Sequence, residues 1–222
     1  MNRSFLLILS FFLLITFTSC NSHQETEISL AGTWQFSLDP DDKGMDALPF
    51  DQTIKLPGSL QNQGFGNDIG LTTKWTGGIQ DSSYYKSEVY APYRQKGNIK
   101  VPFWLNPTKQ YVGAAWYRHE ITIPSDWKGE DIYFCMERPH FESTVYLDGN
   151  CLGSANSLST PHQYELKNVS PGKHLLTVKI DNRLVIPVGV NSHSVSDHTQ
   201  TNWNGIIGSI KLEKRPQIHI DY

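Results

Sequence analysis

Short runs of alternating apolar and polar residues, separated by turn residues, limit the fold of this chain more than any other feature. In 174–180, Leu176, Val178 and Ile180 fall on one face, because successive side chains of a strand point to opposite sides. No segment after residue 27 carries a sustained helical period. The pattern predicts an all-β protein, an antiparallel β-sandwich. The strand-like runs are 28–38, 53–56, 114–123, 131–137, 144–147, 163–166, 173–180 and 208–212.

The residues between the runs are typical of turns. Asp148-Gly149 is a strong hairpin signal, because glycine tolerates the positive φ that tight hairpin turns require. The stretch 39–44 holds three aspartates and ends in Gly44. It lacks the ligand spacing of a known calcium loop, so a solvated turn is expected there.

The N-terminus reads as an export signal. Arg3 precedes an apolar run over 5–17, which is short for a membrane span, and Thr18-Ser19-Cys20 follows. Small residues before a cysteine resemble a bacterial lipoprotein cleavage site. We therefore predict a signal peptide over 1–19, a lipidated Cys20 and a polar tether over 20–27; an ordinary secretory signal with a chance cysteine is the alternative.

This leader predicts a location in the cell envelope. Acyl chains on Cys20 would anchor the protein to a membrane, and we expect the periplasm-facing side of the outer membrane. After removal of the leader, the chain is long enough for one good core.

Charge and cysteine content restrict the partners. The net charge is −3, the isoelectric point is about 6.2 and no basic run occurs, so nucleic-acid binding is not expected. Cysteines and histidines lack metal-ligand spacing, and no cofactor is expected. Cys135 and Cys151 can form a disulfide in an oxidising compartment, or remain unpaired on buried strand faces, the interpretation we favour.

A long stretch without periodicity, 59–108, is rich in glycine, asparagine and aromatic residues. Loops of this length are usually disordered or functional. Disordered segments are poor in aromatic residues, so we expect this one to pack over another part of the molecule.

Several segments resemble the N-terminal sugar-binding domain of glycoside hydrolase family 2, which includes β-galactosidases, β-glucuronidases and β-mannosidases. The resemblance is strongest to members labelled β-galactosidase. It implies a jelly-roll β-sandwich over 28–215 and the start of a linker to a further domain over 216–222. The segments that carry it are LAGTWQFSLDP, IKLPGSL, WYRHEITIPSDWKG, ERPHFESTVYLDGNCLG, LSTPHQYEL, SPGKHLLTVKIDNR and SDHTQTNWNGIIGSIKLE.

The resemblance also implies what the sandwich does not supply. Family 2 hydrolysis uses two glutamates on a later (β/α)₈ barrel, with carboxyl groups about 5–5.5 Å apart across the sugar. The sandwich uses the chain up to about residue 215, and no asparagine is followed by the family's acid/base glutamate. We therefore expect no catalytic residues here and no hydrolysis by this chain alone.

In the family, loops of this domain complete a sugar pocket, and the stretch before the last strand is one of them. The residues expected to contact sugar there are Asp197, His198, Asn202 and Trp203. Several members place an acid six residues before the glycine that corresponds to Gly205. Thr199 occupies that position here. A structural role for Trp203 and Asn204, packing the sandwich edge and fixing the turn, is the alternative.

Three further positions are candidates for the sugar site. Asn182 and Arg183 end a strand, where the planar guanidinium can clamp a carboxylate or a partner backbone, or cap the strand. Asn106 is suggested by the resemblance, from a region where members contribute an asparagine. His140 suits an interdomain or sugar-facing contact, or a structural place in a turn, and Glu137-Arg138 suits a structural ion pair.

Three functions share this fold. The chain can be a module that binds β-galactoside-type carbohydrate weakly without catalysing its hydrolysis. It can be one part of a split or truncated β-galactosidase that acts with the remaining family 2 domains. It can also be a protein-interaction module that contacts no sugar.

Overall fold

A computed structural model describes residues 26–75, 82–101, 107–184, 186, 188, 189, 192, 197, 202–216 and 218. The predicted leader, with Cys20, lies outside the described residues, as do His198 and Asn106. None of the helices in the described part of the chain is long and apolar enough to cross a membrane.

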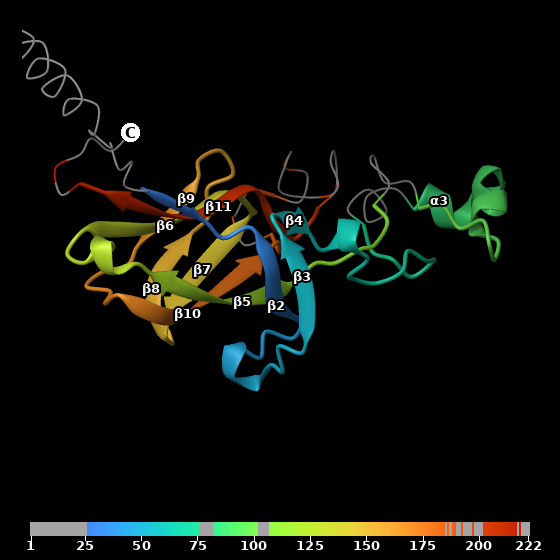
Figure 1. Ribbon diagram of the computed structural model, residues 1–222. Coiled ribbons are helices and arrows are strands. Elements are labelled where there is room, and N and C mark those ends of the chain that lie inside the picture. The colour runs from blue at the N-terminus through green and yellow to red at the C-terminus, as the bar shows by residue number, and fades with distance from the viewer. Residues whose placement is uncertain are drawn as a thin grey trace, which may run out of the picture.

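The predicted antiparallel β-sandwich is confirmed. Two sheets lie face to face, with strand orders β1-β11-β6-β9 and β3-β2-β5-β10-β7-β8, and β4 pairs with β11 beside the first path (Figure 1). The strands are β1 (Glu27–Ser29), β2 (Gly32–Asp39), β3 (Gln52–Leu56), β4 (Gly58–Ser59), β5 (Ala114–Ile123), β6 (Asp131–His140), β7 (Glu142–Leu147), β8 (Asn150–Ala155), β9 (His162–Glu165), β10 (Gly172–Asp181) and β11 (Gly205–Arg215).

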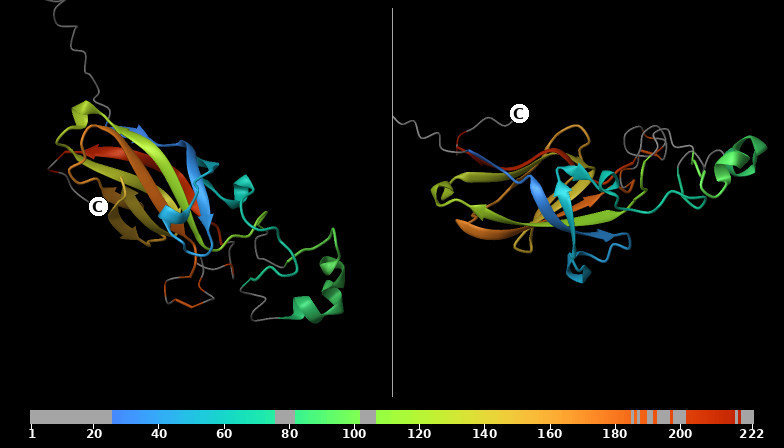
Figure 2. Two further views of the ribbon diagram at one scale, coloured as in Figure 1. Left: turned by 90° about the horizontal axis from the view of Figure 1, so that it is seen from below. Right: turned by 45° about the vertical axis from the view of Figure 1, so that its right-hand side comes forward.

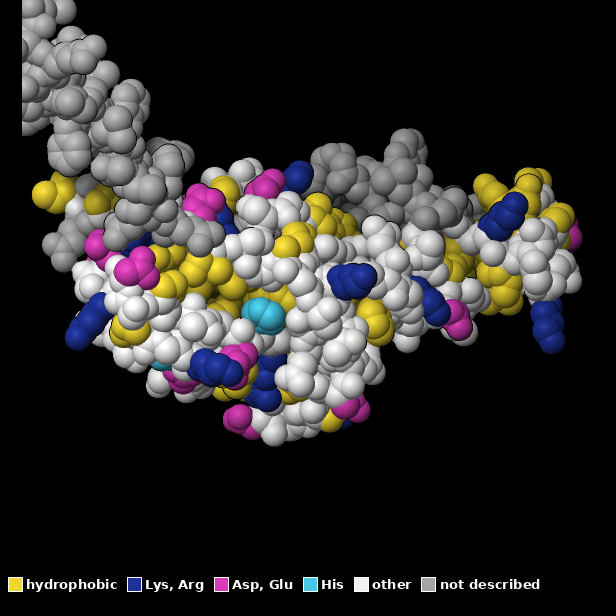
Figure 3. Space-filling view, viewed as in Figure 1, with side chains coloured by type: hydrophobic (Ala, Val, Ile, Leu, Met, Phe, Trp, Pro, Cys, Tyr) yellow, Lys and Arg dark blue, Asp and Glu magenta, His cyan; other side chains and the backbone are white. Residues whose placement is uncertain are grey.

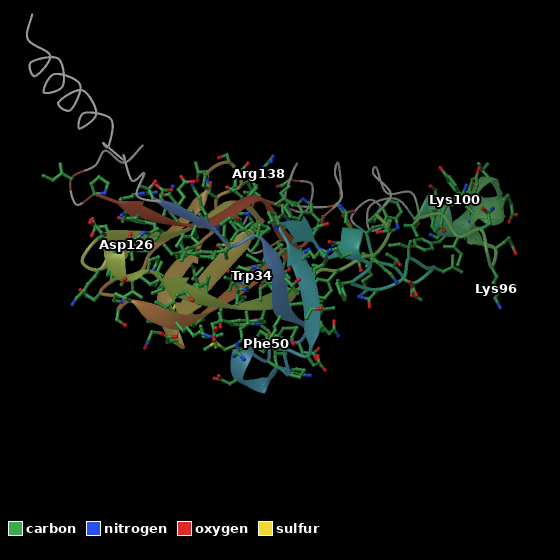
Figure 4. All side chains as sticks on the ribbon, viewed as in Figure 1. Trp34, Phe50, Lys96, Lys100, Asp126 and Arg138 are labelled. Carbon is green, nitrogen blue, oxygen red and sulfur yellow. The ribbon has the colours of Figure 1, made fainter. Side chains whose placement is uncertain are left out.

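The core follows the predicted alternation. Leu176, Val178 and Ile180 on β10 are all fully buried between the sheets, as are Trp34 and Phe36 on β2. Trp34, labelled in Figure 4, lies in the middle of the sandwich, where its indole N–H donates to the carbonyl of Leu30 at 2.9 Å. Apolar burial of this kind is the main stabilising contribution to the fold.

The last strand is longer than predicted and irregular. The register between β11 and β6 shifts between Ile207 and Ile210. The Glu137 carboxylate accepts the backbone N–H of Ser209 at 2.9 Å, and Arg138 lies 3.4 Å from the same carboxylate. The predicted Glu137–Arg138 ion pair is therefore present, on the surface beside a β-bulge.

The turn after β2 is less solvated than expected. Asp39 is buried, and its carboxylate accepts the backbone N–H groups of Lys43 and Gly44 and the indole N–H of Trp116. Burial raises the pKa of Asp39, but these three donors outweigh it and hold the pKa below its usual value. The carboxylate of Asp39 closes the turn internally.

Residues 82–101 form an arm that extends away from the sandwich in every view (Figures 1 and 2). The arm contains α3 (Ser83–Lys86) and the 3-10 helix η3 (Glu88–Arg94). Its Tyr84 and Val101 join Trp75 in a small cluster separate from the main core. The long segment expected to be packed therefore packs in two ways: Leu60 and Phe65 at its start lie against the sandwich core, whereas the arm packs on itself. Figure 3 shows apolar side chains gathered at the far end of the arm, beside basic ones.

The two cysteines with described positions are unpaired. Cys135 is buried, and burial raises the pKa of its thiol to about 11. Cys151 is exposed on β8, a strand absent from the predicted runs. Unpaired cysteines were expected, but only Cys135 lies on a buried face.

A buried serine–histidine pair lies in the sandwich. The Nε2–H of His162 donates to the Ser157 carbonyl at 2.9 Å, so Nδ1 accepts from the Ser143 hydroxyl at 2.6 Å. The Tyr164 hydroxyl lies 2.7 Å from the same serine oxygen. Ser143 is fully buried, so this arrangement packs the core and offers no surface nucleophile.

The buried imidazole predicts a loss of stability in mild acid. Burial lowers the pKa of His162, so the unfolded chain takes up a proton before the folded one. The free energy of unfolding should fall as pH decreases from about 6.5, by at most about 1.4 kcal/mol per pH unit for this one proton. Urea unfolding between pH 7.5 and 5 measures the slope, and His162→Gln should reduce it.

His174 provides the opposite control. Burial lowers its pKa, but hydrogen bonds to Asp148 and the Ser170 carbonyl raise it above the usual value overall. Its stabilising contribution is complete below about pH 6.5 and disappears as pH rises through the raised pKa. His174→Gln should therefore remove the gain in stability that accompanies a fall in pH through the raised pKa, and should leave the slope below about pH 6.5 unchanged. A slope below about pH 6.5 that His162→Gln does not reduce would contradict the assignment.

Candidate functional site

The loop before β11 is fixed to the sandwich through Asn204. This side chain is fully buried, and its amide donates to the carbonyls of Gly113 and Ile180, both at 3.0 Å. Its oxygen accepts the Tyr117 hydroxyl at 2.9 Å. One asparagine therefore joins the end of the loop to β5, β10 and the segment before β5.

A pair of asparagines, Asn202 and Asn182, holds the loop further along. Asn202 and Asn182 exchange hydrogen bonds: the Asn202 amide donates to the Asn182 carbonyl at 2.9 Å, and the Asn182 amide donates to the Asn202 side chain at 3.1 Å. Asn182 also bonds the backbone of Gly113 and Tyr111, both at 2.8 Å. Asn182 is fully buried, so it supports the loop from below.

Trp203 lies against His140. The two rings are stacked, with centroids 4.6 Å apart, and the His140 Nδ1–H donates to the Trp203 carbonyl at 2.8 Å. His140 is buried at the end of β6. This histidine thus orients the backbone and the indole of the predicted sugar-contact residue.

Arg183 clamps carboxylates of its own chain. Its guanidinium contacts both oxygens of Asp181 and lies 3.0 Å from Asp42. Asp181 is buried, and Lys179 also pairs with Asp42, at 2.8 Å. The expected carboxylate clamp exists within the sandwich, where it joins the turn after β2 to the end of β10.

Asp197 lines a cleft of about 670 Å³ between the loop and the long segment before β5. Asn67 and Gln110 form one wall, and their backbones exchange hydrogen bonds at 2.8 and 3.0 Å. Trp75 and Tyr111 supply aromatic surface. The other lining residues are Pro40, Asp68, Thr72, Thr73, Lys74 and Val112.

The cleft combines hydrogen-bonding groups of both kinds. Asp68 and Asp197 provide acceptors, Lys74 provides an ammonium donor, and amides and hydroxyls provide both. The Lys109 ammonium, 2.5 Å from Asp68, holds the pKa of that carboxyl below its usual value. A few polar groups beside aromatic surface suit a ligand with many hydroxyls, each of which must be bonded again when it leaves water.

The residues that were predicted to contact sugar, and that the structure describes, fall into two groups. Asp197 lines the cleft, and Asn202 and Trp203 lie in the adjoining loop. Asn182 and Arg183 bond within the chain. The cleft residues Asn67, Thr73 and Gln110 were not predicted, because Asn67 and Thr73 lie in a segment without periodicity and Gln110 comes just after it. The sequence signal that could have indicated this cleft is the polar pair Asn67-Asp68, which lies between Gly66 and Gly70.

Comparisons with known proteins agree with this architecture. No family model matches the chain. A β-galactosidase large subunit from Lactobacillus acidophilus is 24% identical over 212 residues, which cover 90% of this chain and 31% of that protein. Over this length the chain is homologous to that subunit, a protein of glycoside hydrolase family 2.

Solved structures show the same fold. A β-glucuronidase from Ruminococcus gnavus matches with a TM-score of 0.57 and 19% identity, covering 86% of this chain and 29% of that one. A Faecalibacterium prausnitzii β-glucuronidase matches with a TM-score of 0.54 and 19% identity, over 86% and 31% of the two chains. The chain thus spans about a third of the length of each protein that it matches.

Proposed function

We propose that this family 2 domain is a carbohydrate-binding β-sandwich that has no catalytic role alone. It binds β-galactoside-type sugars weakly and contributes Asp197 to a sugar pocket. The observation that supports this proposal is the cleft, in which Asp197 faces the same space as amides, hydroxyls and the indole of Trp75. Homology to a β-galactosidase large subunit favours galactose over other sugars.

Titration with galactose or lactose tests this proposal. We expect dissociation constants in the millimolar range or weaker, about −4 kcal/mol. Asp197→Asn removes a charged acceptor and should weaken binding about 10-fold, since hydrogen bonds to charged groups contribute about 1.5–3 kcal/mol. Asp126→Asn is the matched control, because Asp126 is exposed at the far end of the sandwich from the arm (Figure 4). Equal affinities in both variants would contradict a role for Asp197.

A second candidate function is one part of a split β-galactosidase. The relative named a large subunit favours it, because this chain corresponds to less than a third of that protein. The purified chain should not cleave a chromogenic β-galactoside. Turnover should appear only after the remaining family 2 domains are added as a separate chain. Turnover by the purified chain alone would contradict both candidates.

We also propose that the protein is a lipoprotein of the cell envelope, anchored through Cys20. The support is the sequence alone: an apolar run followed by Thr18-Ser19-Cys20. Cys20→Ala should move the protein from the membrane fraction to the soluble fraction, because the acyl chains are lost. Cys151→Ala is the control and should leave fractionation unchanged. Membrane association retained by Cys20→Ala would exclude lipid anchoring at this position.

A further inference from the structure

The arm, residues 82–101, carries apolar side chains that face water. Val89 is 75% exposed, and Tyr85 and Tyr93 are each 41% exposed. All three belong to the short helices α3 and η3. Figure 3 shows apolar side chains gathered at the end of the arm that lies furthest from the sandwich. Exposed apolar side chains that gather in one place indicate an interaction surface.

Hydrogen bonds within the arm hold these side chains in a defined arrangement. Tyr84 is buried, and its hydroxyl donates to the Tyr93 carbonyl at 3.2 Å. The Arg94 guanidinium donates to the carbonyls of Tyr84 and Ser87, the latter at 3.0 Å. The backbone N–H of Lys100 donates to the same Tyr93 carbonyl at 3.0 Å. The exposed side chains therefore project from a structured segment with its own small core.

The arm is basic, although the chain as a whole is acidic. Residues 82–101 contain Lys86, Arg94, Lys96 and Lys100 and a single acid, Glu88, so the arm has a net charge of +3 on a chain of net charge −3. All three lysines are exposed, and among the described residues no carboxylate forms an ion pair with them. Their charges are available to an anionic partner.

Lysines beside exposed apolar groups favour a lipid surface over a protein or a soluble polyanion. The Lys100 ammonium lies 5.6 Å from the centre of the Tyr93 ring. Lysine is depleted in the centres of protein interfaces. At a bilayer its aliphatic stem can lie along apolar groups while the ammonium contacts lipid phosphates, and tyrosine is enriched at the same depth. A soluble polyanion would pair with the lysines but would offer Val89 no apolar surroundings.

We propose that the tip of the arm is a membrane-contact site that binds the surface of an anionic lipid bilayer. The side chains of Tyr85, Val89 and Tyr93 enter the headgroup region, and the three exposed lysines contact lipid phosphates. This contact depends neither on acylation of Cys20 nor on the cleft at Asp197. A protein attached both through its N-terminus and through the arm would have a defined orientation on the membrane.

Sedimentation with lipid vesicles tests the proposal on residues 21–222, which lack the predicted leader and Cys20 but include every residue that the structure describes. The protein should bind vesicles of equal parts phosphatidylglycerol and phosphatidylcholine, and added salt should weaken this binding by screening the charges. Vesicles of phosphatidylcholine alone should bind it far more weakly. Equal binding to both kinds of vesicle, or binding to neither, would refute the proposal.

Two triple variants with the same change in charge locate the binding surface. Replacing the three exposed lysines of the arm with glutamine should weaken binding about 100-fold in total, at about 5-fold per lysine. The matched control is the combination of Lys128→Gln, Lys167→Gln and Lys173→Gln, because these lysines are exposed on the sandwich. It should bind nearly as well as the wild type. Equal losses in the two variants would mean that overall charge, rather than the arm, determines binding.

A fluorescent label tests whether the tip enters the bilayer. Cys151→Ala removes the exposed thiol, and an environment-sensitive fluorophore is then attached at Val89→Cys. Spin-labelled lipids in the anionic vesicles should quench this fluorophore. The same label at Asp126→Cys, at the far end of the sandwich from the arm (Figure 4), should stay unquenched.

Two results would assign the arm to another partner and overturn the proposal. If dextran sulfate binds as tightly as the vesicles and the label at position 89 stays unquenched, the arm contacts a soluble polyanion. If replacing the arm lysines converts a dimer into a monomer without changing vesicle binding, the arm joins two copies of the chain. Neither result bears on galactose binding at the Asp197 cleft, which the arm variant should leave unchanged.

Discussion

Replacing Gly205 with alanine should destabilise the protein by about 3–5 kcal/mol, from a close backbone contact and an unfavourable φ together. Gly205 has φ of +143°, and a Cβ atom there would lie 2.4 Å from the Gly58 carbonyl oxygen and 2.8 Å from the Ser59 Cα. Both are backbone atoms of β4, which pairs with β11 at this point, so neither can rotate away. Urea unfolding followed by tryptophan fluorescence measures the loss.

Gly149→Ala separates the two contributions. Gly149 also has a positive φ, +82°, but nothing lies within 4 Å of the Cβ position. Only the conformational cost applies, and we expect about 1–2 kcal/mol. If Gly205→Ala costs no more than Gly149→Ala, the close approach of β4 to β11 does not constrain position 205.

Replacing Asn204 with alanine should have an effect of similar size, about 3–4 kcal/mol, because several buried polar groups lose their partners together. The variant leaves the Tyr117 hydroxyl and the carbonyls of Gly113 and Ile180 without the Asn204 side chain. Tyr117 is itself fully buried, so water cannot easily replace the lost partner. Thermal and urea unfolding measure the change.

A double-mutant cycle with Tyr117→Phe tests the origin of this loss. Removal of both partners avoids the unpaired hydroxyl, so the double variant should be less destabilised than the sum of the single variants, by about 1–2 kcal/mol. Strict additivity would mean that the Tyr117–Asn204 hydrogen bond contributes little, and that the cost of Asn204→Ala comes from the cavity and the carbonyls.

The fold was predictable because its strands carry strong local signals. The run 114–123 matches β5 at both ends, although its first four residues are all buried and only its last residues alternate. β8 was missed because Cys151, Gly153 and Ser154 give it neither alternation nor β-branched residues. The short strand β4 has only two residues, and its pairing with β11 depends on contacts distant in sequence.

The site was less predictable, because burial decides which polar residues face a ligand. Asn182 and Asp197 look alike as sequence candidates, yet Asn182 lies under the loop while Asp197 lines the cleft. Gln61 carries no local signal at all. Its side-chain oxygen accepts the backbone N–H of Asn204, which lies 143 residues later in the chain.

Because the loop before β11 is anchored by buried residues, the positions in and beneath it differ in how freely they can change during evolution. Asn182, Asn204 and Gly205 form part of the interior, so a change at any of them disturbs folding before it alters recognition. Asp197 instead lines the cleft, outside the buried framework. Selection can therefore alter ligand preference at position 197 while the buried asparagines keep the framework constant.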